Sequence, residues 1–260
     1  MKIAYASDLH FEFNGFLIYK LIENINQNTD VLILAGDIQT HDKIIDDLLY
    51  IHSALPHIHI VFVTGNHEFF GGAISKVEAQ LKLAFDDHPK IHYLEKSSFE
   101  LDGVVFLGTT LWTGFNANEH FSQCVSEENA QRGIYDFKVV KQDDGAFQTI
   151  YCKQMYHENC SWMRNTLKEV NNKTTIAITH FPPSPELCHG SIPTGPLSNY
   201  FQTNCHAIMH PHQPDYWVYG HNHWSDEKTT GATKFMSNQP GYPDEFCNTD
   251  KLVKYFTVEV

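Results

Sequence analysis

The feature that most constrains this chain is a series of short apolar runs that each end in Asp, Asn or His. Runs of four to six residues rich in Val, Ile and Tyr are typical of buried strands. We predict such strands at Lys2–Ala6, Val31–Ala35, 58–63, Thr174–Thr179 and Tyr216–Tyr219. The polar residues that follow them are, in order, Asp8-x-His10, Gly36-Asp37, Gly65-Asn66-His67-Glu68, His180 and Gly220-His221-Asn222-His223.

Helical patterns separate the first strands, at about 16–28 and 43–54, and a third follows at about 73–86. Alternation of strand and helix predicts right-handed crossovers and a largely parallel sheet. The residue pattern at 99–111 differs from these helical patterns and predicts two strands joined by a turn at Asp102-Gly103. Further strands are expected at Thr233–Ser237 and 252–260. The fold class is therefore α/β.

The region 114–170 is predicted to be a helical insertion in a single domain that spans residues 1–260. Its later half, 146–170, has the pattern of one long helix, and its polar part, 122–144, is expected to be a mobile flap. The segment 181–196 carries five prolines, which predicts an irregular loop.

Composition excludes several classes of protein. A formal net charge of −13 argues against a broad nucleic-acid-binding surface. No apolar run reaches the roughly 18 residues that a membrane span needs, and the N-terminus does not resemble a signal peptide. The six cysteines lack C-x-x-C spacing, so we expect reduced structural thiols and a cytoplasmic protein.

All the polar motifs follow the carboxyl ends of predicted strands, where ligands bind in open α/β sheets. Imidazole and carboxylate together suit manganese, iron or zinc. Taken singly, Asp8 could cap a helix, His10 could be a core histidine, and Asp37 could belong to an Asx turn. Their shared position favours a metal site. The other histidines show no ligand pattern and are expected at the surface or behind the site: His52, His57, His59, His88, His92, His120, His157, His206, His210 and His212.

The ordered set D-x-H, G-D, G-N-H-E, H and G-H-x-H resembles the calcineurin-like metallophosphoesterases. The segments 107–113 (LGTTLWT) and 237–242 (SNQPGY) are similar to bacterial-type members of unassigned substrate. The motifs run from Asp8 to His223 and so cover most of the chain. The resemblance implies two mixed β-sheets packed as a sandwich flanked by helices. It also implies two divalent or trivalent metal ions, with Mn²⁺, Fe or Zn²⁺ as the expected elements. One ion would be held by Asp8, His10, Asp37 and His223, and the other by Asp37, Asn66, His180 and His221.

The same resemblance implies a mechanism. A hydroxide that bridges the two metals would attack phosphorus in line with the ester oxygen, and His67 would face the phosphate and protonate the leaving group. The segment after Asp37 lacks the Asp-Arg-Gly of protein serine/threonine phosphatases, and the tyrosine ligand of purple acid phosphatases is also missing. Candidate pocket walls are Glu12, Phe13, Trp112, Asn238 and Tyr242.

The expected function is hydrolysis of a phosphate monoester or diester of a small substrate. Two alternatives remain open: a metal-dependent nuclease, which the acidic balance disfavours, and a non-catalytic metal-binding scaffold, which would be expected to lack a ligand or His67. We expect a small phosphate ester as the partner, rather than a membrane or a nucleic acid. The sequence leaves the oligomeric state open.

Overall fold

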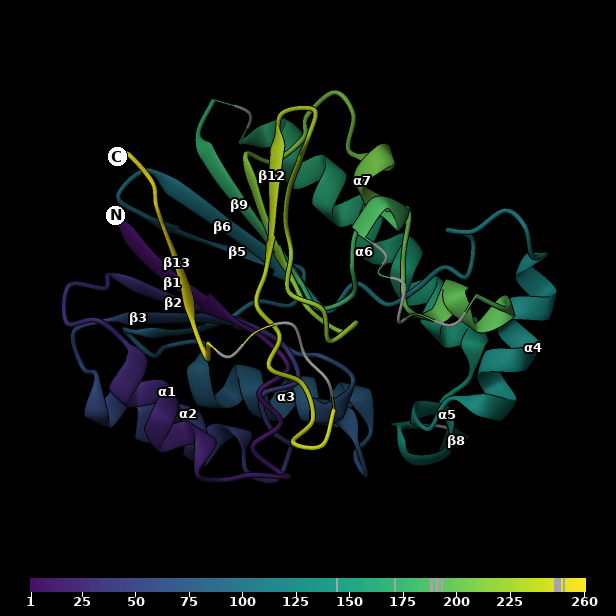
Figure 1. Ribbon diagram of the computed structural model, residues 1–260, viewed down its shortest axis with the longest axis horizontal. Helices are drawn as coiled ribbons and strands as arrows, with labels where there is room; N and C mark the ends of the chain where they lie inside the picture. Colours follow the sequence, from purple (N-terminus) through teal and green to yellow (C-terminus); the bar gives the residue numbers. More distant parts are fainter. Residues whose placement is uncertain are drawn as a thin grey trace.

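Two β-sheets pack face to face at the centre of the molecule (Figure 1). The fold is described here from a computed structural model, which describes residues 1–143, 145–170, 172–187, 189, 192, 194–245, 249 and 251–260. The first sheet has the order β13 (Lys254–Thr257), β1 (Lys2–Ala6), β2 (Val31–Ala35), β3 (His59–Val63) and β4 (Ile91–Tyr93). Strands β1 to β4 are parallel, and only the pairing of β13 with β1 is antiparallel.

The second sheet is also mixed. Its order is β11 (Glu227–Thr230), β12 (Thr233–Ser237), β10 (Tyr216–Tyr219), β9 (Thr174–Thr179), β6 (Val104–Thr109) and β5 (Ser97–Leu101). The four inner strands are parallel, and the two edge strands pair antiparallel with their neighbours. The β5–β6 hairpin turns at Asp102 and Gly103, whose φ angles of 48° and 82° are those of a tight primed turn.

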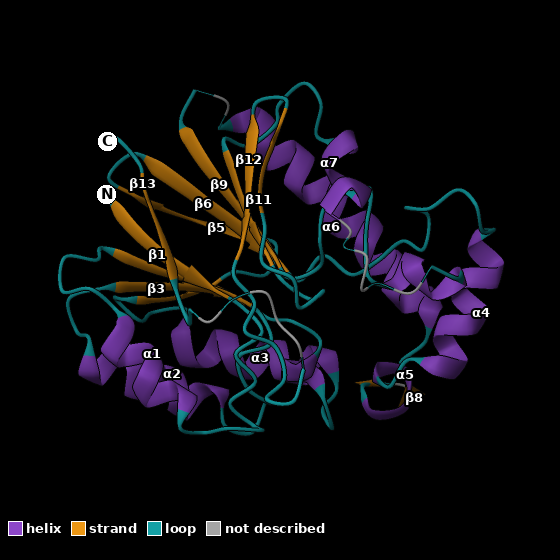
Figure 2. Ribbon diagram, in the orientation of Figure 1, coloured by secondary structure: helices purple, strands orange, loops and turns teal. Residues whose placement is uncertain are grey.

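Helices cover the outer faces of both sheets (Figure 2). The first sheet carries α1 (Leu17–Asn24), α2 (Ile44–Ala54) and α3 (Ile74–Phe85), and the second carries α6 (Thr149–Glu169) and α7 (Cys205–Ile208). To one side lie α4 (Gln123–Gly133), α5 (Asp136–Val139) and the two-stranded ribbon of β7 (Lys141–Gln142) and β8 (Gly145–Ala146). No helix in the described part of the chain is long and apolar enough to cross a membrane.

Alternation along the strands builds this layered core. In β1, Ile3 and Tyr5 belong to the cluster between the sheets, whereas Ala4 and Ala6 belong to the cluster beneath the helices. Successive strand residues point to opposite faces, so a run that is apolar throughout can be buried on both. This explains why VLILA in β2 is fully buried. The two apolar faces fix how far each strand extends, and thus where the following loop begins.

The structure confirms the predicted α/β sandwich of two mixed sheets flanked by helices. It corrects the flap, because the described part of 122–144 contains α4 and α5, with Asp136 and Phe137 buried; Asp144 lies outside the described residues. The sequence analysis also missed β4, β11 and α7, which have three to four residues each. Elements this short contain too few residues to show a periodic pattern of hydrophobicity in the sequence. In addition, β11 is a polar edge strand.

Candidate metal centre

The carboxyl ends of five parallel strands meet at one place, and their loops carry all seven predicted ligands. Strands β1, β2 and β3 of the first sheet lead to Asp8 and His10, to Asp37, and to Asn66. Strands β9 and β10 of the second sheet lead to His180 and to His221 and His223. Six of these seven residues are buried, and the side chain of the seventh, His223, is only 11 % exposed. The site therefore bridges the two sheets.

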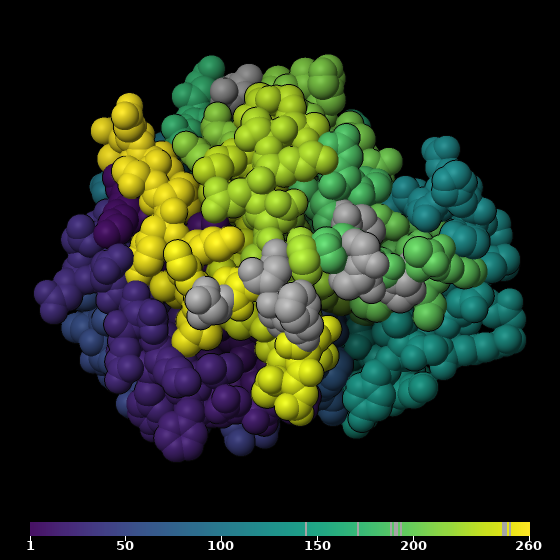
Figure 3. Space-filling model, viewed as in Figure 1, coloured from purple at the N-terminus to yellow at the C-terminus, as the bar shows by residue number. Residues whose placement is uncertain are grey.

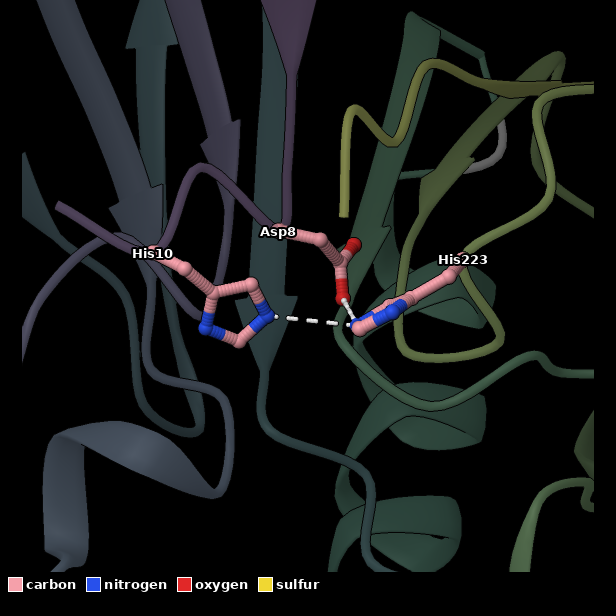
Figure 4. Close-up of side chains that lie close together, drawn as sticks. All are labelled: Asp8, His10 and His223. Atoms are coloured by element: carbon pink, nitrogen blue, oxygen red, sulfur yellow. Dashed lines mark hydrogen bonds and ion pairs between the residues drawn. The ribbon is translucent and has the colours of Figure 1, made fainter. Parts of the chain in front are cut away.

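Asp8, His10 and His223 form the first group of converging side chains (Figure 4). Nε2 of His10 lies 3.2 Å from Nε2 of His223, and the latter lies 3.4 Å from Oδ1 of Asp8. Oδ2 of Asp37 lies 3.8 Å from Nε2 of His10 and completes the group. Ligand atoms that bind the same metal ion, each at about 2.0–2.2 Å from it, lie at such separations from one another.

The second group forms around Asn66. Its Oδ1 lies 3.1 Å from Nε2 of His180 and 3.1 Å from Nδ1 of His221. The two imidazole nitrogens are 3.2 Å apart, and Nε2 of His180 lies 3.4 Å from Oδ2 of Asp37. The same Asp37 oxygen therefore belongs to both groups.

The donor chemistry of both groups fits metal ions. Nδ1 of His10 donates to Glu12, Nδ1 of His223 donates to Glu245, and Nδ1 of His180 donates to the carbonyl of Ala35. Each of these bonds fixes the tautomer that presents the Nε2 lone pair to the centre, as in known histidine metal sites. Lone pairs crowded at this distance repel each other unless a cation or proton lies between them.

Charge points the same way. Asp8 and Asp37 are buried carboxylates, and burying a charge is costly without a partner. Burial opposes protonation of His180 and His223, but the nearby carboxylates raise the pKa of His180 to about 9 and that of His223 to about 10. Burial and the proximity of His180 lower the pKa of His221 well below its ordinary value, so this ring stays neutral. Cations can replace the protons and balance the carboxylates.

The backbone is strained where it delivers the ligands. Asp8, His10, Asp37, His221 and His223 all have positive φ angles, between 45° and 78°. For residues with a side chain this conformation costs about 1–3 kcal/mol each, and such strain gathers at functional sites. Gly65 is required by the close approach of a neighbouring loop, because a Cβ there would lie 2.2 Å from Oδ1 of Asp37.

Glu68 ties two of the ligand loops together. Its carboxylate accepts from the backbone N–H groups of Asp37 at 3.0 Å, Ile38 at 2.7 Å and Gly65 at 2.6 Å. Burial, together with the charge of Asp37, raises the pKa of Glu68 to about 7. The last residue of the G-N-H-E motif thus shapes the site without facing it.

His67 lies beside the two groups, outside both. Its Nδ1 donates to Oε1 of Glu12 at 2.8 Å, and the same oxygen accepts from His10 at 2.9 Å. Its Nε2 lies 3.9 Å from Oδ2 of Asp37 and 3.0 Å from the hydroxyl of Tyr242. Burial opposes ionisation, but the charges of Asp37 and Glu12 raise the pKa of His67 above its ordinary value. Glu12 therefore lies behind the site as a shared acceptor.

Asp136 was missed by the sequence analysis. It is buried at the start of α5, where its Oδ1 accepts from Nδ2 of Asn66 at 3.2 Å and its Oδ2 accepts from the hydroxyl of Tyr200. Burial raises its pKa to about 6. No motif marks this residue, because its role depends on how the insertion folds back over the strand ends.

A cavity of about 590 Å³ opens in front of both groups. The insertion supplies Ile134, Tyr135 and Asp136 to its walls, and the segment after β9 supplies Ile192, Tyr200 and Phe201. Figure 3 shows the teal insertion on one side of the molecule and the yellow C-terminal segment against the purple N-terminal part. Both segments thus contribute to the walls of this cavity.

The proposed pocket walls divide into two kinds. Phe13 and Tyr242 line the cavity. Trp112 does not: it is buried and packs against Phe147 and Phe181. Asn238 is also buried, and its amide donates to the carbonyl of Lys251. The expectation that these two line the pocket was wrong, because both belong to the packed layer beneath it.

The remaining histidines lie away from both groups. Most are exposed or half-buried, as expected, but His206 is buried against Trp217 and Phe235 of the second sheet. The four cysteines in the described residues, Cys124, Cys152, Cys160 and Cys205, are free thiols; Cys188 and Cys247 lie outside that part of the chain.

The chain is similar in sequence to known proteins. The model of the family described as calcineurin-like phosphoesterase matches residues 1–225. An uncharacterised protein of Acanthamoeba polyphaga mimivirus is 26 % identical over 268 residues, which cover 94 % of this chain and 92 % of the viral protein.

Two solved structures show the same fold. The phosphopantetheinyl hydrolase of Mycobacterium tuberculosis has a TM-score of 0.78 at 17 % identity, covering 99 % of this chain and 96 % of its own. A dimetal phosphatase of Danio rerio has a TM-score of 0.53 at 11 % identity, covering 92 % and 87 %.

Proposed function

This chain belongs to the calcineurin-like phosphoesterase family, and on that premise we propose that it hydrolyses small phosphate esters at a dinuclear metal centre. The observation that carries the proposal is the position of Asp37. Its Oδ2 lies 3.8 Å from Nε2 of His10 in one group and 3.4 Å from Nε2 of His180 in the other. A carboxylate placed between two sets of lone pairs can serve two ions at once.

The ligand assignment follows from these two groups. Asp8, His10, Asp37 and His223 would hold one ion, and Asp37, Asn66, His180 and His221 the other. When bound, two such ions neutralise the phosphate oxygens and lower the pKa of water so that hydroxide can attack phosphorus. The imidazole and carboxylate donors suit manganese, iron or zinc.

The chain itself contributes His67 as the proposed proton donor. The hydrogen bond from its Nδ1 to Glu12 leaves Nε2 facing the cavity. An imidazolium held by a carboxylate can donate the Nε2 proton to a leaving alkoxide and spread the negative charge on phosphate before that transfer. Tyr242, whose hydroxyl lies 3.0 Å from Nε2, restricts the orientation of the ring.

The non-catalytic scaffold is disfavoured, because all seven proposed ligands converge and His67 is held in place. The nuclease is disfavoured by the charge of the chain, which has 18 Lys and Arg against 31 Asp and Glu. The cavity of this protein is also lined by the acidic residues Asp136 and Glu245, whereas the phosphate backbone of a DNA duplex would need cationic residues there.

The test is a panel of esters with protein loaded with Mn²⁺. It contains 4-nitrophenyl phosphate, bis(4-nitrophenyl) phosphate, a phosphopantetheinyl ester and linear duplex DNA; the third is included because a protein of the same fold is a phosphopantetheinyl hydrolase. We expect turnover of the small esters and little cleavage of the duplex. Rapid degradation of the duplex would favour the nuclease, and no turnover by fully loaded protein would favour the scaffold.

A further inference from the structure

The walls of the cavity carry chemistry that the metal ligands do not explain. Three of the exposed large aromatic residues of the chain gather there: Phe13 and Tyr135 are each 60 % exposed, and Tyr242 is 37 % exposed. Exposed apolar surface around a polar centre marks a binding site. These rings are therefore positioned to contact a ligand at the centre.

The aromatic side chains form a continuous wall that begins at His67. Phe70 stacks on His67 with ring centroids 4.0 Å apart, and Tyr135 meets Phe70 edge-on at 5.7 Å. On the other side Phe13 meets Tyr242 edge-on at 5.3 Å. A group attached to a phosphate at the centre would lie between these two pairs of rings.

The described residues of the same walls include no lysine or arginine. None of the ten residues outside the described ranges is Lys or Arg either. The charged side chains that line it beyond the metal ligands and His67 are the carboxylates Asp136 and Glu245. A second phosphate on the substrate would thus meet aromatic rings and carboxylates with no cation to pair with, which is costly for a charge taken from water.

We propose that this cavity selects phosphate esters with a single phosphate and an uncharged apolar or aromatic arm, and that it rejects esters that carry a second anionic group. The inference rests on the proposed function and names the substrate class of the same site. The arm gains apolar contact with Phe13, Phe70 and Tyr135, while the scissile phosphate alone uses the charge of the centre.

The first test compares two diesters that differ by one phosphate. The 4-nitrophenyl ester of thymidine 5′-phosphate and its 3′-phosphorylated form share the scissile phosphate and the leaving group. We expect kcat/KM for the phosphorylated form to be lower by about tenfold or more, because an unpaired anion must enter an apolar site. Tyr135→Lys places a cation in the wall. It should reduce the ratio of kcat/KM between the unphosphorylated and the 3′-phosphorylated ester by about threefold or more.

The second test addresses the arm. Benzyl 4-nitrophenyl phosphate should exceed methyl 4-nitrophenyl phosphate in kcat/KM by about tenfold, the scale of one group in an apolar pocket. Phe13→Ala and Tyr135→Ala should reduce that preference, mainly through KM. Tyr19→Ala is the matched control, since Tyr19 is an exposed aromatic residue of α1 outside the cavity lining.

The outcomes are distinguishable. Equal or faster turnover of the 3′-phosphorylated ester, or equal turnover of the methyl and benzyl esters, would overturn this inference and leave the phosphoesterase intact. Turnover of 4-nitrophenyl phosphate without turnover of any of these four diesters would overturn this inference alone. No turnover of 4-nitrophenyl phosphate or of any of the four diesters by metal-loaded protein would overturn the proposed function and this inference with it.

Discussion

Oδ1 of Asp136 accepts a hydrogen bond of 3.2 Å from Nδ2 of Asn66, and so joins the helical insertion to a proposed metal ligand. The bond orients the amide so that Oδ1 of Asn66 faces His180 and His221. Since an amide can present either its oxygen or its nitrogen, a fixed acceptor behind the nitrogen decides which one reaches a metal. The segment that contains Asp136 therefore supports a proposed metal ligand as well as lining the cavity.

Asp136→Ala should weaken metal binding at the site that contains Asn66. Removal of a residue that orients a metal ligand typically costs about 10–100-fold in affinity or activity. Titration of metal-free protein with Mn²⁺, read out by calorimetry and by activity, measures the change. Asp143→Asn is the control, because this exposed residue of the same segment accepts a hydrogen bond from Ser75 and does not line the cavity. Wild-type affinity in Asp136→Ala would show that Asn66 needs no support.

This contact also changes the expected result of deleting residues 122–144. The sequence suggested that such a deletion would affect selectivity more than metal binding, because the segment holds no ligand. With Asp136 in that segment, we now expect both to fall.

Asp37→Asn should be the most damaging ligand substitution. The neutral amide would leave both groups of lone pairs without the carboxylate that they share, so elemental analysis should find loss of both metals. Asp8 is proposed as a ligand of one ion, whereas Asp37 is proposed as a ligand of both, so Asp8→Asn should remove mainly one metal. Equal metal content in the two variants would contradict the shared position of Asp37.

His67→Ala should separate metal binding from chemistry. Metal content should stay unchanged, because His67 lies outside both ligand groups, while kcat should fall by about 10²–10⁴-fold, the range for a lost general acid. The loss should be smaller for 4-nitrophenyl esters, whose leaving group needs no proton, than for alkyl esters. An equal loss for both kinds of ester would exclude His67 as the acid.

His92 should make the fold less stable in acid. Burial, followed by the proximity of His59, His88 and Lys90, lowers its pKa from 6.5 to about 4. The unfolded chain therefore binds a proton near pH 6.5 that the folded chain resists, so the stability contribution is present above pH 6.5 and declines as pH falls toward 4.

His92→Gln should lose less stability than the wild type between pH 7 and pH 5. His92 is only half-buried, so solvent screens part of the effect. We expect the fall in Tm from pH 7 to pH 5 to be smaller in His92→Gln than in the wild type by roughly 2–4 °C, which corresponds to about 1 kcal/mol of unfolding free energy in a chain of this size. The exposed His120 provides the matched control in His120→Gln, measured at the same metal load. Parallel Tm curves for wild type and His92→Gln would contradict the prediction.

The sequence by itself determined the five strands that lead to the proposed ligands, and the polar residues that follow them. Strands such as VLILA are apolar on both faces, so the residues themselves indicate how far each strand extends and that it is buried. The parallel arrangement of these strands brings their carboxyl ends together. The local pattern Asp8-x-His10 and the glycines before Asp37 and Asn66 therefore predicted which loops would carry the proposed ligands.

Only the tertiary structure decided which side chains share a partner. Glu12 lies between His10 and His67, and Asp136 lies behind Asn66, because loops and helices far apart in sequence pack against one another there. Neither contact has a sequence period, since each joins single residues across the fold. The same holds for the cavity: its aromatic walls and the absence of Lys and Arg from its described lining come from segments that only folding places side by side.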